Sequence, residues 1–379
     1  MGLKTIETPS LVLNRAALLR NTGRMTERFR QLGVAFRPHM KTAKSIDVAR
    51  LALAGNFGGI TVSTLKEAEY FAEHGINDIT YAVSIVPQRL PRLARLIGRG
   101  VAVSVITDSV EIAREISNRA VELGIVLDVL IELDSGEKRA GLLPESEELL
   151  VLGRLLDELP GTRLKGVLTH AGNSYQGGSL EGIQAIAEHE RWCAATAATR
   201  LRATGLACPV VSVGSTPTAV HGRDFTGITE VRAGVYMFGD VFQWEIGSHG
   251  LEDITVSVLA TVTAHRPELN TALIDAGSLA LSKDRSTGAP GLPEDVGFGL
   301  VMNETATHRI GRVRVGRVYQ EHGMLEADGP FPFEQLPVGS RVRVLPNHVC
   351  MTAAMYEEYQ VVDGAADEAM ETWPRINGW

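Results

Sequence analysis

The sequence predicts an α/β protein in which a closed (β/α)8 TIM barrel is followed by a second, mostly antiparallel β domain. Two observations lead to this prediction. Short β-rich runs alternate with helix-like segments over the first two thirds of the 379 residues, and after about residue 250 that alternation gives way to Val-rich strand patterns. Eight strand and helix units suit a closed barrel, and a doubly wound open sheet is the alternative.

The expected barrel strands are short and rich in apolar and β-branched residues. The segments between them, such as residues 64–75 and 109–124, carry apolar residues at spacings of three and four, which is typical of amphipathic helices. In such a barrel the carboxyl ends of the strands form the mouth where active sites are built. The eight runs are residues 34–37, 58–63, 78–84, 101–108, 126–134, 164–170, 208–214 and 227–234.

The second domain is predicted from a change in pattern. Segments such as residues 254–265 and 308–318 alternate apolar and polar positions and are separated by Gly, Pro and Asp turns. We therefore expect the barrel over residues 12–250 and the β domain over residues 251–379. The N-terminal residues 1–11 are a candidate addition to the β domain.

Composition narrows the class of protein. The content of 44% hydrophobic and 22% charged residues is that of an ordinary soluble protein, and no apolar run is long enough to span a bilayer. The polar start MGLKTIETPS lacks the apolar core of a signal peptide, and three widely spaced cysteines do not suggest a disulfide framework, so we expect a cytoplasmic protein. A net charge of -8 gives no footprint for nucleic acid, and any basic cluster should serve a small anion.

The stretch RPHMKTAKS, residues 37–45, crowds cations at the end of a predicted strand. If the chain is extended there, Arg37, His39 and Lys41 share a face. Like charges would disfavour the ammonium form of Lys41 and yield the neutral amine needed to form a Schiff base. Lys44 is the rival nucleophile, and a solvated lysine after a strand is the plain alternative.

A second candidate is the run VVSVGSTPT, which leads from a buried strand into Gly214, Ser215 and Thr216. Successive N–H groups and hydroxyls at such a turn can bind a phosphate, and the AGVY run at residues 233–236 ends the next strand at the same mouth. The Gly-Lys-Ser/Thr signature of a P-loop is absent from the run, which argues against nucleotide triphosphate chemistry. A plain strand-to-helix turn would use the same residue types.

The run LPNHVCMT supplies a candidate metal pair. It follows an alternating segment, so a continued strand would put His348 and Cys350 on one face. Imidazole and thiolate together favour Zn²⁺ over hard cations. Glu321 and His322 are candidates for further ligands or acid and base residues. A half-buried cysteine with an incidental histidine is the alternative.

Arg139 and Tyr175 follow consecutive barrel strands and could reach one ligand. Arg139 could equally pair with Glu132, Asp134 or Glu137 on the rim, and surface ion pairing is the commoner fate of such an arginine.

Together these motifs resemble the fold-type III pyridoxal phosphate (PLP) enzymes of the D-threonine aldolase and D-serine dehydratase group, nearly from end to end. Within that group they are most similar to the dehydratases of D-threo-3-hydroxyaspartate. The resemblance implies an alanine-racemase-like barrel, bound PLP, and a homodimer with active sites near the subunit interface. It rests on RPHMKTAKS, TVSTLKEAE, ELDSGEKRAGL, LTHAGNSY, VSVGSTPT, ITEVRAGVYMFGD, QEHG and LPNHVC.

The resemblance also assigns expected roles. It matches Lys41, rather than Lys44, to the lysine that carries the cofactor, and leaves His39 and His322 as further catalytic candidates. The implied cofactor-binding residues are Lys41, Arg139, Tyr175, Gly214, Ser215, Thr216, Gly234 and Tyr236, and the implied metal ligands are His348 and Cys350.

The implied reaction is removal of water from a D-β-hydroxy-α-amino acid of the D-threo-3-hydroxyaspartate or D-serine type, giving a 2-oxo acid and ammonia. The alternative is aldolase cleavage to glycine and an aldehyde. The thiolate of Cys350 suits Zn²⁺ and favours dehydration, whereas a carboxylate in its place would suit Mn²⁺, which is the second candidate metal. Two other classes stay open, namely a PLP-carrying regulatory protein and a metal-dependent hydrolase barrel without PLP.

Overall fold

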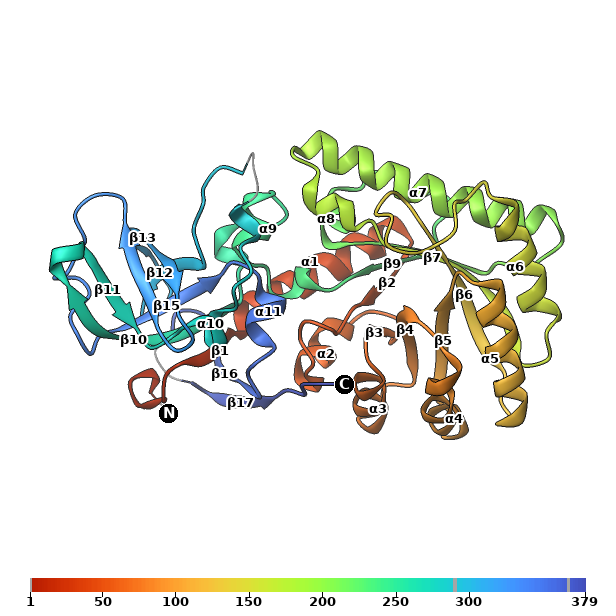
Figure 1. Cartoon of the computed structure of the whole chain (residues 1–379), viewed down its shortest axis with the longest axis horizontal. Helices are drawn as coiled ribbons and strands as arrows, with labels where there is room; N and C mark the ends of the chain where they lie inside the picture. The colour runs from red at the N-terminus through yellow and green to blue at the C-terminus, as the bar shows by residue number, and fades with distance from the viewer. Residues whose placement is uncertain (1, 289–291, 367–368) are drawn as a thin grey trace. The chain divides into compact units, whose positions relative to one another are not determined.

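Two separate sheets organise the protein, as seen in a computed structural model that describes residues 2–288, 292–366 and 369–379 (Figure 1). The chain divides into two compact units, which we call the barrel unit and the β unit. The barrel unit comprises Arg24–Lys41, Ala49–Gly234 and Gly378–Trp379, and the β unit comprises the residues up to Gly23, Thr42–Val48 and Val235–Asn377.

The sheet of the barrel unit contains eight parallel strands in the order β2-β9-β8-β7-β6-β5-β4-β3. A parallel bridge between His39 and Thr61 joins the two end strands of this order, so the sheet closes on itself. The predicted parallel barrel is therefore confirmed, and the open sheet is excluded. The strands are β2 (Ala35–Pro38), β3 (Ile60–Val62), β4 (Asp78–Ser84), β5 (Ala102–Thr107), β6 (Leu127–Leu133), β7 (Thr162–Thr169), β8 (Val210–Val213) and β9 (Glu230–Ala233).

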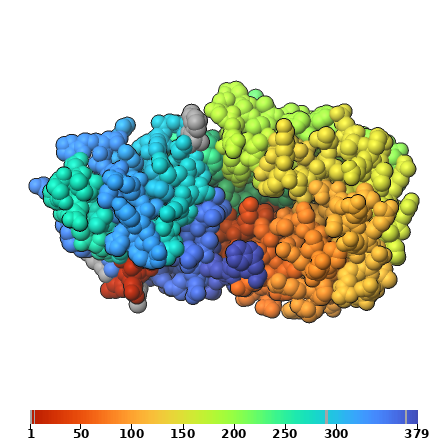
Figure 2. All heavy atoms as spheres, in the orientation of Figure 1, coloured from red at the N-terminus to blue at the C-terminus, as the bar shows by residue number. Residues whose placement is uncertain are grey.

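Helices follow the barrel strands, and several begin at a side chain that caps them. Thr64, Ser109 and Ser215 each accept a hydrogen bond from the backbone N–H three residues later, which satisfies one of the unpaired donors of the first turn. Helices α3 to α7 lie around the outside of the sheet and form much of the surface of this unit, orange to yellow-green in Figure 2. The helices are α1 (Arg15–Leu32), α2 (Ile46–Leu53), α3 (Leu65–Glu73), α4 (Leu90–Gly98), α5 (Val110–Glu122), α6 (Glu147–Glu158), α7 (Leu180–Ala203) and α8 (Thr216–His221). Among the helices of the described residues, none is long and apolar enough to cross a membrane.

The β unit contains a nine-stranded sheet in the order β11-β14-β13-β12-β15-β10-β1-β16-β17. Its N-terminal strand β1 pairs in parallel with β16, while the remaining pairings are antiparallel, as the sequence predicts. The strands are β1 (Ser10–Asn14), β10 (Val256–Arg266), β11 (Thr271–Ile274), β12 (Gly299–Asn303), β13 (Arg309–Val318), β14 (Gly323–Ala327), β15 (Arg341–Pro346), β16 (Glu358–Val362) and β17 (Glu371–Pro374).

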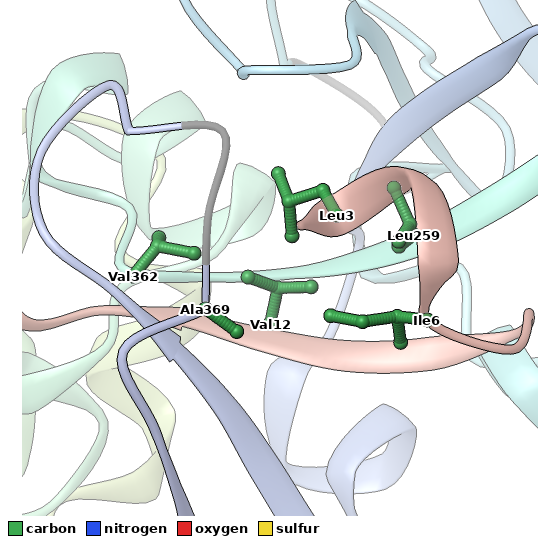
Figure 3. Close-up of a cluster of buried hydrophobic side chains, with 6 residues drawn as sticks. All are labelled: Leu3, Ile6, Val12, Leu259, Val362 and Ala369. Carbon is green, nitrogen blue, oxygen red and sulfur yellow. The ribbon is translucent and has the colours of Figure 1, made fainter. Parts of the chain in front are cut away.

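The first residues of the chain pack into the β unit. A short 3-10 helix, η1 (Leu3–Thr5), buries the side chain of Leu3, and Arg341 donates hydrogen bonds to the carbonyls of Leu3 and Ile6. Figure 3 shows the resulting apolar cluster of Leu3, Ile6, Val12, Leu259, Val362 and Ala369. The domain boundary after residue 250 stays a prediction.

A short helix begins in the β unit where the sequence pattern predicted that a strand continues to Cys350. Strand β15 ends at Pro346, and His348 begins helix α11 (Val349–Ala353), whose Thr352 N–H donates to the His348 carbonyl over 3.1 Å. The expectation that an extended strand carries the metal pair is therefore wrong, because the alternation before Pro346 does not continue beyond it. The other helices of this unit are α9 (Val241–Glu245) and α10 (Ser278–Leu281).

Candidate active site

Lys41 and His39 lie together just after β2 in the barrel unit. The Lys41 side chain is exposed, and its backbone N–H donates to Nδ1 of the half-buried His39 over 3.3 Å. Nε2 of His39 lies 3.4 Å from the hydroxyl of Ser63, which follows β3. Because Nδ1 accepts a hydrogen bond, the neutral His39 ring carries its proton on Nε2 and directs it toward Ser63.

The positive charge of Arg37, by contrast, is compensated by two carboxylates. Its guanidinium is buried, and it binds Glu230 through Nε at 2.6 Å and Asp78 through Nη1 at 3.0 Å. Burial disfavours the charged guanidinium, but the two carboxylates outweigh it and raise the pKa of Arg37. The Arg37 side chain is therefore neutralised inside the barrel unit by residues at the starts of β9 and β4.

His170 is a site candidate that sequence reasoning missed. It directly follows β7, and its Nδ1 donates to the Gly214 carbonyl, which follows β8, over 2.8 Å. Burial and then the charge of Lys41 lower its pKa to about 3, and the same causes hold the pKa of His39 well below its usual value. Both rings are therefore neutral near pH 7. The signal available in the sequence was the position of His170 at the end of a barrel strand.

A buried arginine gives this region its positive charge. Arg232 on β9 donates to the Ser212 hydroxyl over 2.5 Å and to the Thr169 carbonyl over 2.6 Å. Burial lowers its pKa, and its charge is a further reason for the lowered pKa values of the two histidines. We call Lys41, His39, His170 and Arg232 the barrel cluster.

The predicted phosphate turn after β8 is held from within the chain. Gly214 has a φ of +136°, and a Cβ there would lie 2.0 Å from the Arg232 carbonyl, so the position requires glycine. Its N–H donates to the Glu190 carboxylate over 2.9 Å, and the Ser215 N–H donates to the Thr218 hydroxyl over 3.0 Å. Two of the N–H groups expected to bind a phosphate thus have partners inside the barrel unit.

Glu190 on α7 ties two of the loops at the barrel mouth together. The same oxygen accepts the N–H of Ala171, which follows β7, and the N–H of Gly214, which follows β8, each over 2.9 Å. The carboxyl is 1% exposed, and burial raises its pKa. Its placement could not be read from the sequence, because it comes from the middle of a long helix that packs against these loops.

The other predicted cofactor residues occupy several elements. Gly234 directly follows β9 and closely approaches the chain after β2, since a Cβ there would lie 2.8 Å from the His39 carbonyl. Tyr236 belongs to the β unit, where it is buried in the 3-10 helix η4 (Val235–Met237) and burial raises its pKa. Thr216, the first residue of α8, is also buried.

Arg139 and Tyr175 lie on loops of the barrel unit. Arg139 is 60% exposed and pairs with Glu137 at 3.3 Å, which is one of the three rim carboxylates expected as alternative partners. Tyr175 is half-buried in the 3-10 helix η3 (Gly172–Gln176). Binding of a ligand by Arg139 would compete with this exposed ion pair, which contributes little to the stability of the fold.

The predicted metal pair is brought together in the β unit. His348 is hydrogen-bonded to Cys350, and its Nδ1 lies 2.6 Å from Oδ2 of Asp284, a residue that the sequence did not single out. Burial opposes the charged imidazolium, but the interactions with Cys350, Asp240 and Asp284 outweigh it and raise the pKa of His348 to about 10. We call His348, Cys350, Asp284 and Asp240 the metal-pair cluster.

Asp240 and Thr42 support this cluster. Asp240 is buried, and its carboxylate accepts the N–H groups of Val349 at 3.0 Å and Gln243 at 2.8 Å, which ties the start of α11 to the start of α9. Burial raises its pKa to about 6. The Thr42 hydroxyl lies 3.0 Å from Sγ of Cys350.

His322 and Glu321 lie in the exposed turn between β13 and β14, where the backbone passes close to Gly277. Within the described ranges, no group of three or more His, Cys, Asp or Glu side chains is arranged to hold a metal ion. The role of His322 as ligand or catalyst therefore stays a prediction, and His348 with Cys350 offers two donors.

Comparison with known proteins shows which family this chain belongs to. The alanine racemase N-terminal domain family matches residues 13–241, and the putative serine dehydratase domain family matches residues 255–362. D-threo-3-hydroxyaspartate dehydratase of Delftia sp. (strain HT23) is 45% identical over 100% of this chain and 99% of its own length. D-serine dehydratase of Dictyostelium discoideum is 32% identical over 95% of this chain and 94% of its own. D-threonine aldolase of Arthrobacter sp. is 29% identical over 97% and 93%.

A solved structure agrees with these matches along the whole chain. It is a cysteine-to-alanine variant of D-threo-3-hydroxyaspartate dehydratase in the metal-free form, with 44% identity, a TM-score of 0.95 and full coverage of both chains. The chain therefore belongs to the alanine-racemase-like family of lyases that includes D-threo-3-hydroxyaspartate dehydratase and the D-serine dehydratases.

Proposed function

We propose that this protein is a PLP- and divalent-metal-dependent dehydratase of D-β-hydroxy-α-amino acids. The proposed first substrate is D-threo-3-hydroxyaspartate, which loses water and then, after hydrolysis of the released enamine, yields oxaloacetate and ammonia. D-Serine, which would yield pyruvate and ammonia, is the second substrate to test. The full-length similarity to a dehydratase of the former substrate supports this order.

The barrel cluster fits PLP, which carries an aldehyde and an anionic phosphate. Lys41 offers an exposed primary amine for the aldehyde, and the charge of buried Arg232 favours an anion nearby. Gly234 leaves no room for a side chain beside the His39 carbonyl. The residues proposed to hold the rest of the cofactor are Arg139, Tyr175, Gly214, Ser215, Thr216, Gly234 and Tyr236.

The proposed steps assign work to the chain's own groups. Lys41 would hold the cofactor and, once released, accept the substrate α-proton at Nζ. His39 accepts the Lys41 backbone N–H at Nδ1 and so orients the residue that carries the amine. PLP, when bound, supplies the electron sink that makes the α-carbon acidic.

The metal-pair cluster fits a soft or borderline divalent cation. An imidazole and a thiol lie within hydrogen-bond reach of each other, and Asp284 binds Nδ1, which directs Nε2 to serve as the metal ligand. A Zn²⁺ ion held by His348 and Cys350 would supply Lewis acidity for departure of the β-hydroxyl, with Mn²⁺ as the second candidate.

The observation that carries the choice of dehydration is the sulfur of Cys350 beside His348. A thiolate favours Zn²⁺, and a strong Lewis acid helps most where hydroxide has to leave. The metal-free form described for a cysteine variant of a D-threo-3-hydroxyaspartate dehydratase supports a metal in this family. A homodimer and a cytoplasmic location are further parts of the proposal.

Product analysis tests the proposal. Purified protein, loaded with PLP and Zn²⁺, is incubated separately with D-threo-3-hydroxyaspartate, D-serine and D-threonine, and ammonia, 2-oxo acids and glycine are measured. Ammonia with an equal amount of oxaloacetate from the first substrate is the expected result. Glycine as the main product from D-threonine or hydroxyaspartate would overturn dehydration in favour of aldolase cleavage. The same incubations with Lys41→Ala protein provide the blank.

A further inference from the structure

A buried arginine near the C-terminus stands at the centre of a hydrogen-bond network in the β unit. Arg375 is 7% exposed, and its guanidinium carries several charge-assisted bonds, each to a neutral oxygen. The planar group presents five N–H donors in fixed directions, which lets one side chain reach separate segments. The acceptors are the carbonyls of Thr42, Ala43, Ala353 and Tyr356, the hydroxyl of Tyr359 and the side-chain oxygen of Asn377.

One side of this network holds the chain directly after Lys41. The guanidinium binds the carbonyls of Ala43 and Thr42, each over 3.1 Å. One residue on, the backbone N–H of Ile376 donates to the Lys44 carbonyl over 2.9 Å. Lys44 has a φ of +48°, a left-handed conformation that a residue with a side chain adopts only when its surroundings enforce it. The C-terminal segment therefore fixes the backbone of residues 42 to 44.

The other side of the network holds the helix that carries Cys350. Arg375 binds the carbonyl of Ala353, the last residue of α11, and that of Tyr356 at 2.7 Å. The Tyr359 hydroxyl accepts from Nε of Arg375 and donates to the Ala43 carbonyl, each over 2.8 Å. The end of α11 and the segment after Lys41 are thus bound to the same guanidinium.

We propose that Arg375 is a positioning residue for the reaction, a role that rests on the proposed function. It holds in one network the segment that directly follows Lys41 in the sequence and the helix on which Cys350 is carried. Thr42, which lies in the same held segment, contacts Sγ of Cys350 at 3.0 Å. Loss of the guanidinium should therefore loosen residues 42–48 and residues 349–356 together. It should also weaken metal binding, although the hydrogen bonds of Arg375 given above go to neither His348 nor Cys350.

Hydrogen exchange on metal-free, PLP-free protein tests this directly. Arg375→Lys keeps the charge but removes the fork, and exchange protection in residues 42–48 and 349–356 should fall by about tenfold or more, as expected for a lost charge-assisted bond. Arg341→Lys is the matched control, because Arg341 also donates to backbone carbonyls of a distant segment of this unit, those of Leu3 and Ile6. Arg341→Lys should lower the exchange protection of the N-terminal residues. It should leave the protection of residues 42–48 and 349–356 at the wild-type level.

Zinc affinity, measured by chelator competition, is the second readout. Arg375→Lys should weaken Zn²⁺ binding by roughly 10-fold or more, the size of effect seen when a support of a metal ligand is lost, whereas Arg341→Lys should not change it. If Arg375→Lys does not fold, Tyr359→Phe replaces it, since that change removes only the hydroxyl between Arg375 and Ala43 and should give a smaller shift in the same ranges. Unchanged exchange in both ranges, or equal changes in the Arg341 control, would overturn the inference.

The outcome is separable from that of the proposed function, because exchange is read on protein without ligands. A protein that shows the linked loosening but forms no 2-oxo acid from any substrate would refute the proposed reaction and leave the network established. If the wild-type protein forms the 2-oxo acid but the Arg375 variant shows no linked loosening, the proposed reaction is supported and the role of Arg375 is refuted.

Discussion

The barrel cluster and the metal-pair cluster both contain histidine, but the pKa of the imidazole is shifted in opposite directions in the two clusters. The pKa of His170 is lowered to about 3 and that of His39 is also well below its usual value, whereas the pKa of His348 is raised to about 10. Burial disfavours the charged ring in all three cases, so burial does not explain the difference. The neighbours explain it, because Lys41 and Arg232 face the first two rings while a thiol and two carboxylates face the third.

The difference indicates which kind of ligand each cluster would favour under the proposed function. A region that keeps its histidines neutral beside two cations favours an anion, such as the phosphate of PLP. A region that pulls a proton onto its histidine favours a cation, and a metal ion would take the place of that proton. The variants below change one cluster at a time.

Removal of the Lys41 amine should have the largest effect. Lys41→Ala removes the proposed cofactor link and proton acceptor, so activity should fall by roughly 10⁴-fold and the visible absorption of bound PLP should be lost. Steady-state kinetics and the absorption spectrum measure this. Lys44→Asn is the control, because asparagine tolerates the left-handed backbone at that position, and it should retain both signals. Loss of the cofactor band in the control alone would assign the role to Lys44.

Exchange of the sulfur donor should change the preferred metal. Cys350→Asp replaces a soft donor by a hard one, so Zn²⁺ affinity should fall by roughly 100-fold while Mn²⁺ becomes the better activator. Metal titrations of chelator-treated protein followed by activity assays measure this. Cys193→Ala is the control, since burial raises the pKa of that thiol to about 12 and keeps it protonated. An enzyme equally active with chelator and without would contradict the role of the metal.

Loss of the carboxylate beside His348 should weaken metal binding by a smaller amount. Asp284 binds Nδ1 of His348 at 2.6 Å and fixes the orientation of the ring, so Asp284→Ala should weaken Zn²⁺ binding by roughly 10-fold to 100-fold. Competition with a chromogenic chelator measures the constant. Asp363→Ala, which breaks an exposed ion pair with Arg15 in the same unit, should leave the constant unchanged. An equal loss in both variants would point to general destabilisation.

The smallest effect concerns stability at acidic pH. The pKa of His170 in the folded protein lies below the unfolded value of 6.5. The contribution of His170 to the free energy of unfolding is therefore present above about pH 6.5 and is lost as the pH falls toward about 3. His170→Gln should therefore reduce the acid loss in unfolding free energy by roughly 1 to 3 kcal/mol, as measured by urea denaturation at pH 4 and pH 7. His74→Gln is the matched control, because exposed His74 also makes a 2.8 Å bond to a backbone carbonyl, and an equal change in both variants would contradict a specific role of His170.

Much of the barrel could be predicted from the sequence because its signals are local. Each of the eight expected runs overlaps one parallel strand, and Lys41, His39 and Gly214 were identified from their positions at strand ends. The pairing of His348 with Cys350 was expected from spacing alone. The reason given for it was wrong, since the pair sits at the start of α11 and not on a strand.

The remaining features depend on contacts between distant parts of the chain. Glu190, Asp284 and Arg375 each act on residues far away in sequence, and no local pattern marks a carboxylate or guanidinium for such a task. Arg37 is an example in which the local sequence pattern did not reveal the partners of the side chain. Its neighbours in sequence, His39 and Lys41, suggested a shared cationic face, whereas its neighbours in space, Glu230 and Asp78, neutralise it inside the barrel unit.

The position of β1 bears on how the chain is made. Ser10–Asn14 lies inside the nine-stranded sheet, between β10 and β16, so this strand has to wait for partners that leave the ribosome more than two hundred residues later. The eight barrel strands are all translated in the meantime. The β unit can thus close only after the barrel has emerged, which leaves a nascent apolar strand in need of shielding during translation and makes N-terminal deletions hazardous for production of the enzyme.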